Sequence, residues 1–335
     1  MYINSVKACI YGAGAIGGFI GARLAAQGHA VAAVARGATL AAINARGLRL
    51  VSGGREIASR VVASPEPAKL GEQDLVVVAV KAPAMRDVAS AISPLIGADT
   101  MVVTAMNGVP WWFFDGMPGR YAGMKLATLD ADGAIAGAIP SGRVVGCVVH
   151  ASCRTPEPGV VHNVMGQGLI VGEPAGGASA RVTNLADALN AAGFECRVSE
   201  RIQYDIWYKL WGNMTMNPVS AFTGVTVDRI LDDDLANAFC QRVMEEAKAI
   251  GAAIGCPIEQ TVQDRNAVTR RLGAFKTSML QDVEAGKPLE IDALLTVVRE
   301  IAQRAGLATP NLDALLGLTR VFARSRGLYP AESTT

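Results

Sequence analysis

The chain has 335 residues, which is long enough for two domains that each bury a core of their own. Its 31 lysines and arginines nearly balance its 30 aspartates and glutamates, so charge gives no reason to expect nucleic acid or an anionic membrane as a partner. The six cysteines and three histidines have no spacing typical of a zinc site, and we expect reduced thiols and no bound metal.

The first part of the chain alternates predicted strands and helices. Residues 6–11 form an apolar run that ends at a glycine, residues 15–27 carry small and apolar side chains at helical spacing, and residues 30–35 form a second apolar run. This is a βαβ unit, and because the alternation continues it predicts a parallel sheet. The later apolar runs that we assign to strands are 75–80, 101–105, 144–150, 160–163 and 169–172.

Near residue 201 the pattern becomes wholly helical. The predicted helices are 202–216, 235–250, 258–285, 289–305 and 312–323. We therefore predict an α/β Rossmann-type doubly wound parallel-sheet domain over residues 1–200, followed by an all-α domain over residues 201–335. No run reaches the ~20 apolar residues of a membrane span, and the glycines near the start argue against a signal peptide, so we expect a cytoplasmic protein.

A glycine-rich turn of the form GxGxxG joins the first predicted strand to the first helix. In a dinucleotide site the first glycine permits the tight turn, the second lets the backbone approach a pyrophosphate, and the third lets the helix pack on the strand. Free N–H groups at the helix N-terminus then face the phosphates. The alternative is a glycine-rich turn that binds nothing. The candidate cofactor-binding residues here are Gly12, Gly14, Ala15, Ile16 and Gly17.

The end of the second predicted strand favours NADP(H) over NAD(H). NAD enzymes usually place a carboxylate there for the ribose hydroxyl, whereas this strand ends in Arg36, whose guanidinium suits a 2′-phosphate. The alternative is a solvated charge. Lys81 and Asn107 follow two further strands and could reach the nicotinamide ribose or the substrate, although any lysine or Asn-Gly turn at a strand end has the same pattern.

Three polar residues lie four apart in the first helix of the second part of the chain. Lys209, Asn213 and Asn217 share one helix face among Trp, Leu and Met residues, where unsatisfied polar groups are costly. Such a row fits a 2-oxo acid, because the ammonium can donate to the keto oxygen while the amides bind hydroxyl or carboxylate oxygens. The alternative is a solvated face with two structural asparagines. We expect Pro218 to end or kink this helix just beyond the row.

Two more polar residues are candidates further along. Ser278 lies within the predicted helix 258–285 and could bind the substrate carboxylate. Glu290 opens the next predicted helix and could bind a substrate hydroxyl or hold Lys209 in place, although a carboxylate in a first turn also has a purely structural explanation.

The motifs together resemble those of ketopantoate reductases (2-dehydropantoate 2-reductases), in family order and over nearly the whole chain. The matching motifs are GxGAIG, Arg36, Lys81-Ala82, Asn107-Gly108, Pro158 to His162, Gly172-Glu173, Lys209-Leu-x-x-Asn213-x-x-x-Asn217-Pro218, Ser278 to Asp282 and Glu290-Ile291-Asp292. The resemblance implies a Rossmann domain, a helical domain like that of the 6-phosphogluconate dehydrogenase group, and an active site in the cleft between them.

The resemblance also implies roles for the site residues. Lys209 is similar to the family's general acid and Glu290 to its second essential polar residue. Arg36 resembles the residue that selects NADPH, and Lys81 matches a residue near the nicotinamide. The residues similar to substrate binders are Asn107, Asn213, Asn217 and Ser278, of which Asn107 is also placed near the nicotinamide.

Some positions differ from the family pattern around the substrate. Met106 and Ala84 stand where glutamines are usual, Val227 lies where a further asparagine is expected, and Trp111-Trp112 adds aromatic bulk.

From the resemblance as a whole, the leading hypothesis is NADPH-dependent reduction of 2-dehydropantoate to pantoate. The alternatives are a paralogue for another 2-oxo acid, another dehydrogenase of the wider 6-phosphogluconate dehydrogenase group and a non-catalytic NADPH-binding sensor. Apolar helix faces would permit a homodimer.

Overall fold

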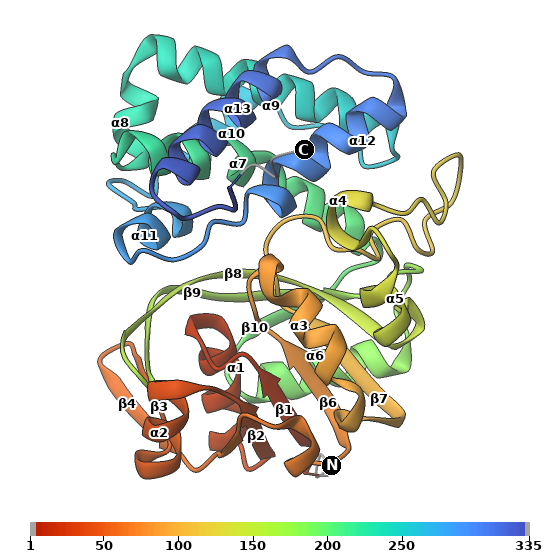
Figure 1. Ribbon diagram of the computed structural model, residues 1–335, viewed down its shortest axis with the longest axis vertical. Helices are drawn as coiled ribbons and strands as arrows, with labels where there is room; N and C mark the ends of the chain where they lie inside the picture. The colour runs from red at the N-terminus through yellow and green to blue at the C-terminus, as the bar shows by residue number, and fades with distance from the viewer. Residues whose placement is uncertain (1–4, 332–335) are drawn as a thin grey trace. The chain divides into compact units, whose positions relative to one another are not determined.

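The computed structural model describes residues 5–331 (Figure 1), which divide into two compact units. The first unit holds the described residues up to 106, together with 112–117 and 132–205. The second holds 107–111, 118–131 and the described residues from 206 onward. Two short segments of the amino-terminal half thus group with the helical unit.

The first unit is built on one mixed sheet, which confirms the predicted α/β class. Within residues 5–331 it has ten strands, in the order β4-β3-β9-β8-β7-β6-β1-β2-β5, with β10 beside β9. Neighbours from β5 to β8 run parallel, whereas β8 with β9 and β3 with β4 are antiparallel. The strands are β1 (Lys7–Tyr11), β2 (Ala30–Val34), β3 (Leu48–Ser52), β4 (Arg55–Ser59), β5 (Val62–Ser64), β6 (Gln73–Val78), β7 (Ile96–Thr104), β8 (Val144–Glu157), β9 (Val160–Gly172) and β10 (Glu195–Val198).

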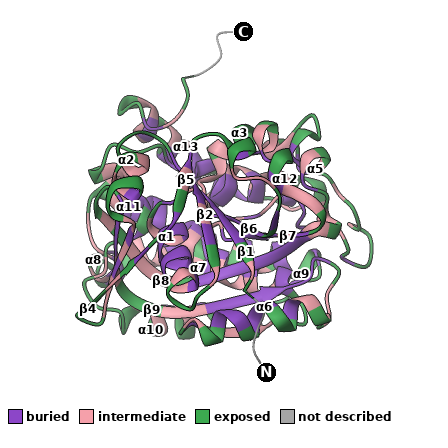
Figure 2. Ribbon diagram, turned by 90° about the horizontal axis from the view of Figure 1, so that it is seen from below, coloured by how far each residue is buried: buried purple, intermediate pink, exposed green. Residues whose placement is uncertain are grey.

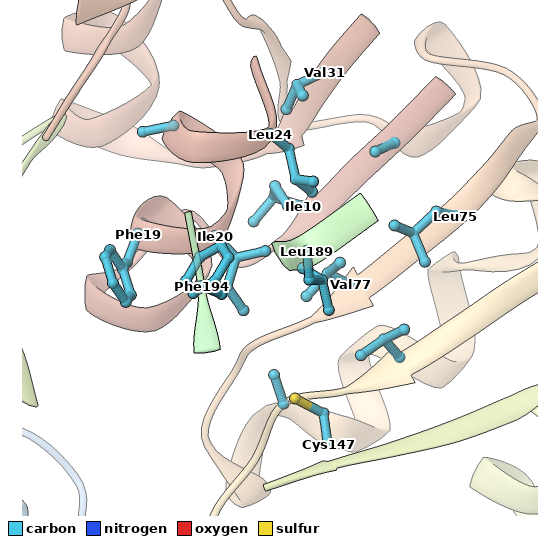
Figure 3. Close-up of a cluster of buried hydrophobic side chains, with 14 of the residues drawn as sticks. Ile10, Phe19, Ile20, Leu24, Val31, Leu75, Val77, Cys147, Leu189 and Phe194 are labelled. Carbon is cyan, nitrogen blue, oxygen red and sulfur yellow. The ribbon is translucent and has the colours of Figure 1, made fainter. Parts of the chain in front are cut away.

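Both faces of the central strands are buried, which explains why their sequences are continuous apolar runs rather than alternating ones. Ile10 of β1 and Val77 of β6 pack with Phe19 and Leu189 in one hydrophobic cluster (Figure 3). Cys9, the neighbour of Ile10, points to the opposite face because successive strand residues alternate, and it is also fully buried. Figure 2 shows the burial of these central strands. The helices of this unit are α1 (Ala15–Ala26), α2 (Gly37–Arg46), α3 (Met85–Ala91), α5 (Ala134–Ala138) and α6 (Ala180–Ala191).

The sheet contains strands that the sequence reasoning missed or divided. The runs 160–163 and 169–172 are parts of one strand, β9, because the polar stretch between them stays paired with β8. The hairpin β3–β4 was not predicted. Its signal was present, since Gly53 and Gly54, with φ angles of 55° and 74°, form the two-residue turn that suits a hairpin.

The second unit is all α-helical in the part of the chain that the structure describes. Trp207 and Trp211 anchor its core, because their indole N–H groups donate to the backbone oxygens of Ala247 at 3.2 Å and Met244 at 2.8 Å. The helices are α4 (Ala127–Asp130), α7 (Ile202–Thr223), α8 (Val227–Asp232), α9 (Asp234–Ala253), α10 (Val262–Arg270), α11 (Ser278–Glu284), α12 (Val297–Ala305) and α13 (Pro310–Ser325), with a π-helical segment at Asp292–Thr296. The first four residues of α7 belong to the first unit.

Two helix predictions were wrong. The predicted helix 258–285 is two helices, because Gly273 takes a left-handed φ of 67° and Thr277 starts α11 by accepting a hydrogen bond from the N–H of Leu280 at 3.1 Å. The predicted helix 202–216 ended too early, because α7 continues through Pro218 to Thr223. Proline removes one backbone donor, and its ring crowds the carbonyl four residues earlier. The residues around it, Thr215, Met216, Val219 and Ser220, are buried, so packing holds the helix together there.

Glu173 ties the end of β9 to the start of α6. Arg181 Nε donates to Glu173 Oε1 at 2.7 Å, Arg181 Nη2 bonds the other oxygen, and Ser179 also donates to the carboxylate. Burial acts to raise the pKa of Glu173, but the hydrogen bonds from Arg181 and Ser179 outweigh it, so the pKa lies below its usual value. The Gly172-Glu173 motif therefore has a structural role in this chain.

We predict that Glu173→Gln lowers the free energy of unfolding at neutral pH by about 1–2 kcal/mol, because the partly exposed Arg181 loses its charged acceptor. A depressed pKa in the folded state stabilises the fold above the carboxylate's unfolded pKa, and this contribution disappears as the pH falls through the folded pKa. The deficit of the variant in urea unfolding should therefore shrink on acidification below about pH 4. Glu66→Gln, which breaks an exposed pair with Lys69, is the control and should change stability by less than about 0.5 kcal/mol. A deficit that stays constant with pH would contradict this account.

Candidate active site

The glycine-rich turn between β1 and α1 has a backbone that only glycine accommodates. Gly12 has a φ of 97°, and a Cβ there would lie 2.7 Å from Val80 Cγ1. A Cβ on Gly17 would lie 2.1 Å from the backbone oxygen of Gly12 and 2.8 Å from Ile10 Cγ2. These two glycines let α1 pack directly on the end of β1.

The N-terminus of α1 fits a diphosphate. A Cβ on Gly14 would have no heavy atom within 4 Å, so the space beside this residue is open. The first helical bond runs from Gly18 N–H to Gly14 O, and the N–H groups of Ala15, Ile16 and Gly17 precede it. No side chain caps this end of α1, and its first turn holds no acidic residue. A dinucleotide diphosphate can therefore accept from these N–H groups.

Two basic residues follow strands of the same unit. Arg36 comes after β2 and precedes α2, its side chain is exposed, and its guanidinium forms no hydrogen bond or ion pair with any residue from 5 to 331. Lys81 comes three residues after β6, is half-buried, and precedes the 3₁₀ turn Ala82–Ala84. Arg36 is thus able to pair with a bound phosphate without breaking an existing bond.

Helix α7 carries the polar row that the spacing predicts. Lys209 and Asn213 are half-buried, and Asn217 is only 5% exposed. Lys209 Nζ donates to Asn107 Oδ1 at 2.8 Å, and Asn217 Nδ2 donates to Ser278 Oγ at 3.4 Å. The structure therefore brings together residues from three separate segments of the second unit. The sequence reasoning assigned Asn107 to the substrate and to the nicotinamide, and it did not foresee the bond to Lys209.

The backbone around Asn107 is fixed by the π-helical segment. Val109 N–H donates to Ala293 O at 2.9 Å. Gly108 has a φ of 82°, and a Cβ there would lie 2.3 Å from the same oxygen. Only glycine allows this approach, so the carbonyl of Ala293 sets the position of Asn107 and through it the direction of the Lys209 ammonium. π-helical turns occur frequently at functional sites.

Glu290 and Ser278 lie at the starts of helical segments. Glu290 is 8% exposed and directly precedes the helical residue Ile291, and its backbone oxygen accepts from Leu294 N–H at 3.2 Å. Ser278 is exposed at the first position of α11, rather than inside a long helix as predicted. The proposed contact of Glu290 with Lys209 stays a prediction.

The residues that differ from the family pattern belong largely to the protein interior. Trp111 and Trp112 are 5% and 1% exposed, and a Cβ on Gly146 would lie 2.6 Å from the Trp112 ring. Val227 is 1% exposed and its N–H donates to Phe275 O at 3.1 Å. The aromatic bulk after Asn107 therefore fills core.

Within residues 5–331, no group of histidine, cysteine and acidic side chains is arranged to hold a metal ion. The six cysteines are free, and burial raises the pKa of Cys9, Cys196 and Cys240 to about 12, which makes these thiols poor nucleophiles. None of the described helices combines the length and the apolar character that crossing a membrane requires.

Comparison with known proteins finds two matching family models. The model described as "Ketopantoate reductase PanE/ApbA" matches residues 8–176, and "Ketopantoate reductase PanE/ApbA C terminal" matches residues 201–323. Together they span most of both units.

Individual relatives match along nearly the whole chain. The 2-dehydropantoate 2-reductase of Mesorhizobium japonicum is 43% identical over 97% of this chain and 100% of its own length. The crystal structure of a Ralstonia solanacearum MolK2 protein described as a ketopantoate reductase is 58% identical with a TM-score of 0.94, covering 97% of this chain and 99% of that one. A structure of D-mandelate dehydrogenase with NADH and anilino(oxo)acetate is 22% identical with a TM-score of 0.82, covering 96% and 99%, and shares the fold alone. The chain therefore belongs to the ketopantoate reductase family.

Proposed function

We propose that this member of the family reduces 2-dehydropantoate to pantoate with NADPH, and that Lys209 is the general acid. The proposal is carried by the 2.8 Å hydrogen bond that directs the Lys209 ammonium along a half-buried helix face. An ammonium held in one direction can protonate an oxygen as negative charge develops on it. The Mesorhizobium japonicum relative, named a 2-dehydropantoate 2-reductase, supports the choice of substrate.

The cofactor-binding residues are assigned from the glycine-rich turn and Arg36. When bound, a reduced nicotinamide supplies the hydride that turns the keto carbon into an alcohol carbon. The N–H groups of Ala15 and Ile16 hold the diphosphate, and the Arg36 guanidinium holds the 2′-phosphate that distinguishes NADPH from NADH. We assign Lys81 to the nicotinamide ribose because it follows a central strand of the sheet.

The second unit positions the acid and moves the proton. An ammonium carries three N–H donors, so Lys209 can donate to the keto oxygen while it keeps its bond to Asn107. Lys209 gives its proton to the nascent alkoxide and recovers one from solvent. Asn213, Asn217 and Ser278 bind oxygens at the rest of the substrate and so fix which face of the keto carbon is attacked.

Glu290 is the second polar residue that we assign to the reaction. It is a buried carboxylate at the start of the segment whose Ala293 oxygen positions Asn107. A substrate hydroxyl or the Lys209 ammonium is a suitable hydrogen-bond donor to this carboxylate.

The substrate is tested by following NADPH oxidation with 2-dehydropantoate beside a panel of other 2-oxo acids. We expect the highest kcat/KM with 2-dehydropantoate. A higher value for another acid would assign the enzyme to that acid instead. Binding of NADPH without turnover of any acid would contradict the proposal in favour of a non-catalytic sensor.

We predict that Lys209→Met lowers kcat by about 10²–10⁴-fold, which is the usual contribution of a positioned acid, while the Kd for NADPH stays the same. Asn107→Asp should raise the pKa of Lys209 by adding a negative charge at its bonding partner. Since the acid must be protonated, the alkaline limb of the kcat profile should then move to higher pH. Lys69→Met, an exposed lysine, is the control. Equal losses in kcat and NADPH affinity for Lys209→Met would contradict its role as an acid.

We predict that Arg36→Ala weakens NADPH binding by at least about tenfold and leaves NADH binding nearly unchanged. Only NADPH carries the 2′-phosphate, so only NADPH loses a binding partner when the guanidinium is removed. Arg36→Glu should bind NADH better than NADPH, since a carboxylate accepts from the ribose hydroxyl. Both affinities are measured by nicotinamide fluorescence without substrate. Arg46→Ala, an exposed arginine at the other end of α2, is the matched control. A similar loss for both cofactors would remove Arg36 from the 2′-phosphate site.

A further inference from the structure

A second cation, Arg265 of helix α10, lies against helix α7 next to the polar row. The guanidinium carbon of Arg265 lies 5.3 Å from the centre of the Tyr208 ring. The guanidinium also lies against Gly212, where a Cβ would come within 3.0 Å of Arg265 Nη2. Tyr208 is itself fixed, because its hydroxyl donates to Gln260 Oε1 at 2.5 Å. The arginine is thus held between an anchored ring and the helix backbone.

The charge of Arg265 has no anionic partner in the described chain. No residue from 5 to 331 accepts a hydrogen bond from its guanidinium, and its Nε is buried and unpaired. Burial lowers the pKa of Arg265, an effect that Tyr208 partly opposes. Arg270, on the same helix, shows the ordinary arrangement, since it is exposed and bonds Asp232 and Leu231 O. A half-buried guanidinium without a carboxylate is costly to the fold, and this cost indicates a ligand.

The position of this charge matches the chemistry of the proposed substrate. Tyr208 directly precedes Lys209, and Gly212 directly precedes Asn213, so Arg265 flanks the polar row on the neighbouring stripe of α7. A 2-oxo acid carries its carboxylate on the carbon next to the keto group. The planar fork of an arginine binds a carboxylate through two parallel hydrogen bonds, which a serine hydroxyl or an amide cannot do.

We propose that Arg265 binds the carboxylate of the 2-oxo acid while Lys209 donates to the adjacent keto oxygen. The inference rests on the proposed function, because it takes the substrate class from there. Lys209 on α7, and Arg265 on α10 where it packs against the neighbouring stripe of α7, then fix the keto group and the carboxylate together. Ser278 and Asn217 are left for the remaining oxygens of the substrate. Gly212 has a specific reason to be glycine, since a side chain there would push the guanidinium away from the helix.

The test compares Arg265→Met with Arg271→Met, which removes an exposed positive charge one residue beyond the same helix. Arg265→Met should raise KM for 2-dehydropantoate by at least about tenfold and leave the Kd for NADPH unchanged, whereas Arg271→Met should change neither. The amide of 2-dehydropantoate lacks the negative charge, so its KM should be the same in wild type and Arg265→Met. Equal losses for the acid and the amide would overturn the proposal.

Thermal unfolding separates this role from a structural one. Methionine has a similar unbranched shape and removes an uncompensated charge, so Arg265→Met should raise the Tm of the ligand-free protein. Oxamate, a stable mimic of a 2-oxo acid, should raise the Tm of the wild type and of Arg271→Met but not that of Arg265→Met. A lower Tm in the ligand-free Arg265→Met protein, together with an intact response to oxamate, would mean that the arginine only supports the fold.

The outcomes distinguish the two proposals. If the wild type does not reduce 2-dehydropantoate, and oxamate binds to the wild type but not to Arg265→Met, the proposed function is wrong and the carboxylate site stands. If the wild type reduces 2-dehydropantoate and Arg265→Met does so with an unchanged KM, the function stands and the carboxylate site is wrong. Gly212→Ala provides an independent variant, since it should raise KM for the acid more than for the amide by displacing the guanidinium.

Discussion

The hydrogen bond between Lys209 and Asn107 is the interaction on which the proposed chemistry depends. A lysine side chain has many rotamers, and an acid catalyst must be held in one of them. Asn107 does this only because its own backbone is fixed, through Gly108 and the N–H of Val109, against the carbonyl of Ala293. The π-helical segment thus positions the proposed acid although none of its side chains is assigned to the substrate. In the first unit the same principle applies to the glycine-rich turn, where missing side chains let α1 approach β1.

Much of the fold follows from the sequence, because the relevant signals are local. Continuous apolar runs predicted the central strands, and glycines at the end of the first strand predicted the turn into α1. The errors arose where packing outweighs local signals. Nothing local distinguishes helix 258–285 from two helices except Gly273 and the cap Thr277, and buried surroundings carry α7 past Pro218. The strand β9 contains a polar stretch that its pairing with β8 holds in place.

The site was predictable only in part, for a physical reason. Spacing along one helix places Lys209, Asn213 and Asn217 on one face, since helical geometry is fixed. It says nothing of which distant segment meets that face, so the bond from Lys209 to Asn107 required the structure. Arg265 gave no sequence signal, because a lone arginine in a polar helix is usually solvated. Only the structure shows that Arg265 is half-buried and packs against Tyr208 and Gly212. It also shows that no described residue accepts a hydrogen bond from the Arg265 guanidinium.

The central claim is that this chain transfers a hydride from a nicotinamide to the keto carbon of 2-dehydropantoate while Lys209 protonates the oxygen. It is tested most directly with NADPH deuterated at C4 of the nicotinamide, with the pantoate formed in ordinary water analysed by NMR and mass spectrometry. The account predicts one deuterium at C2 of pantoate when one of the two C4 epimers is used and none with the other. Product without deuterium from either epimer, or label at any other carbon, would contradict it.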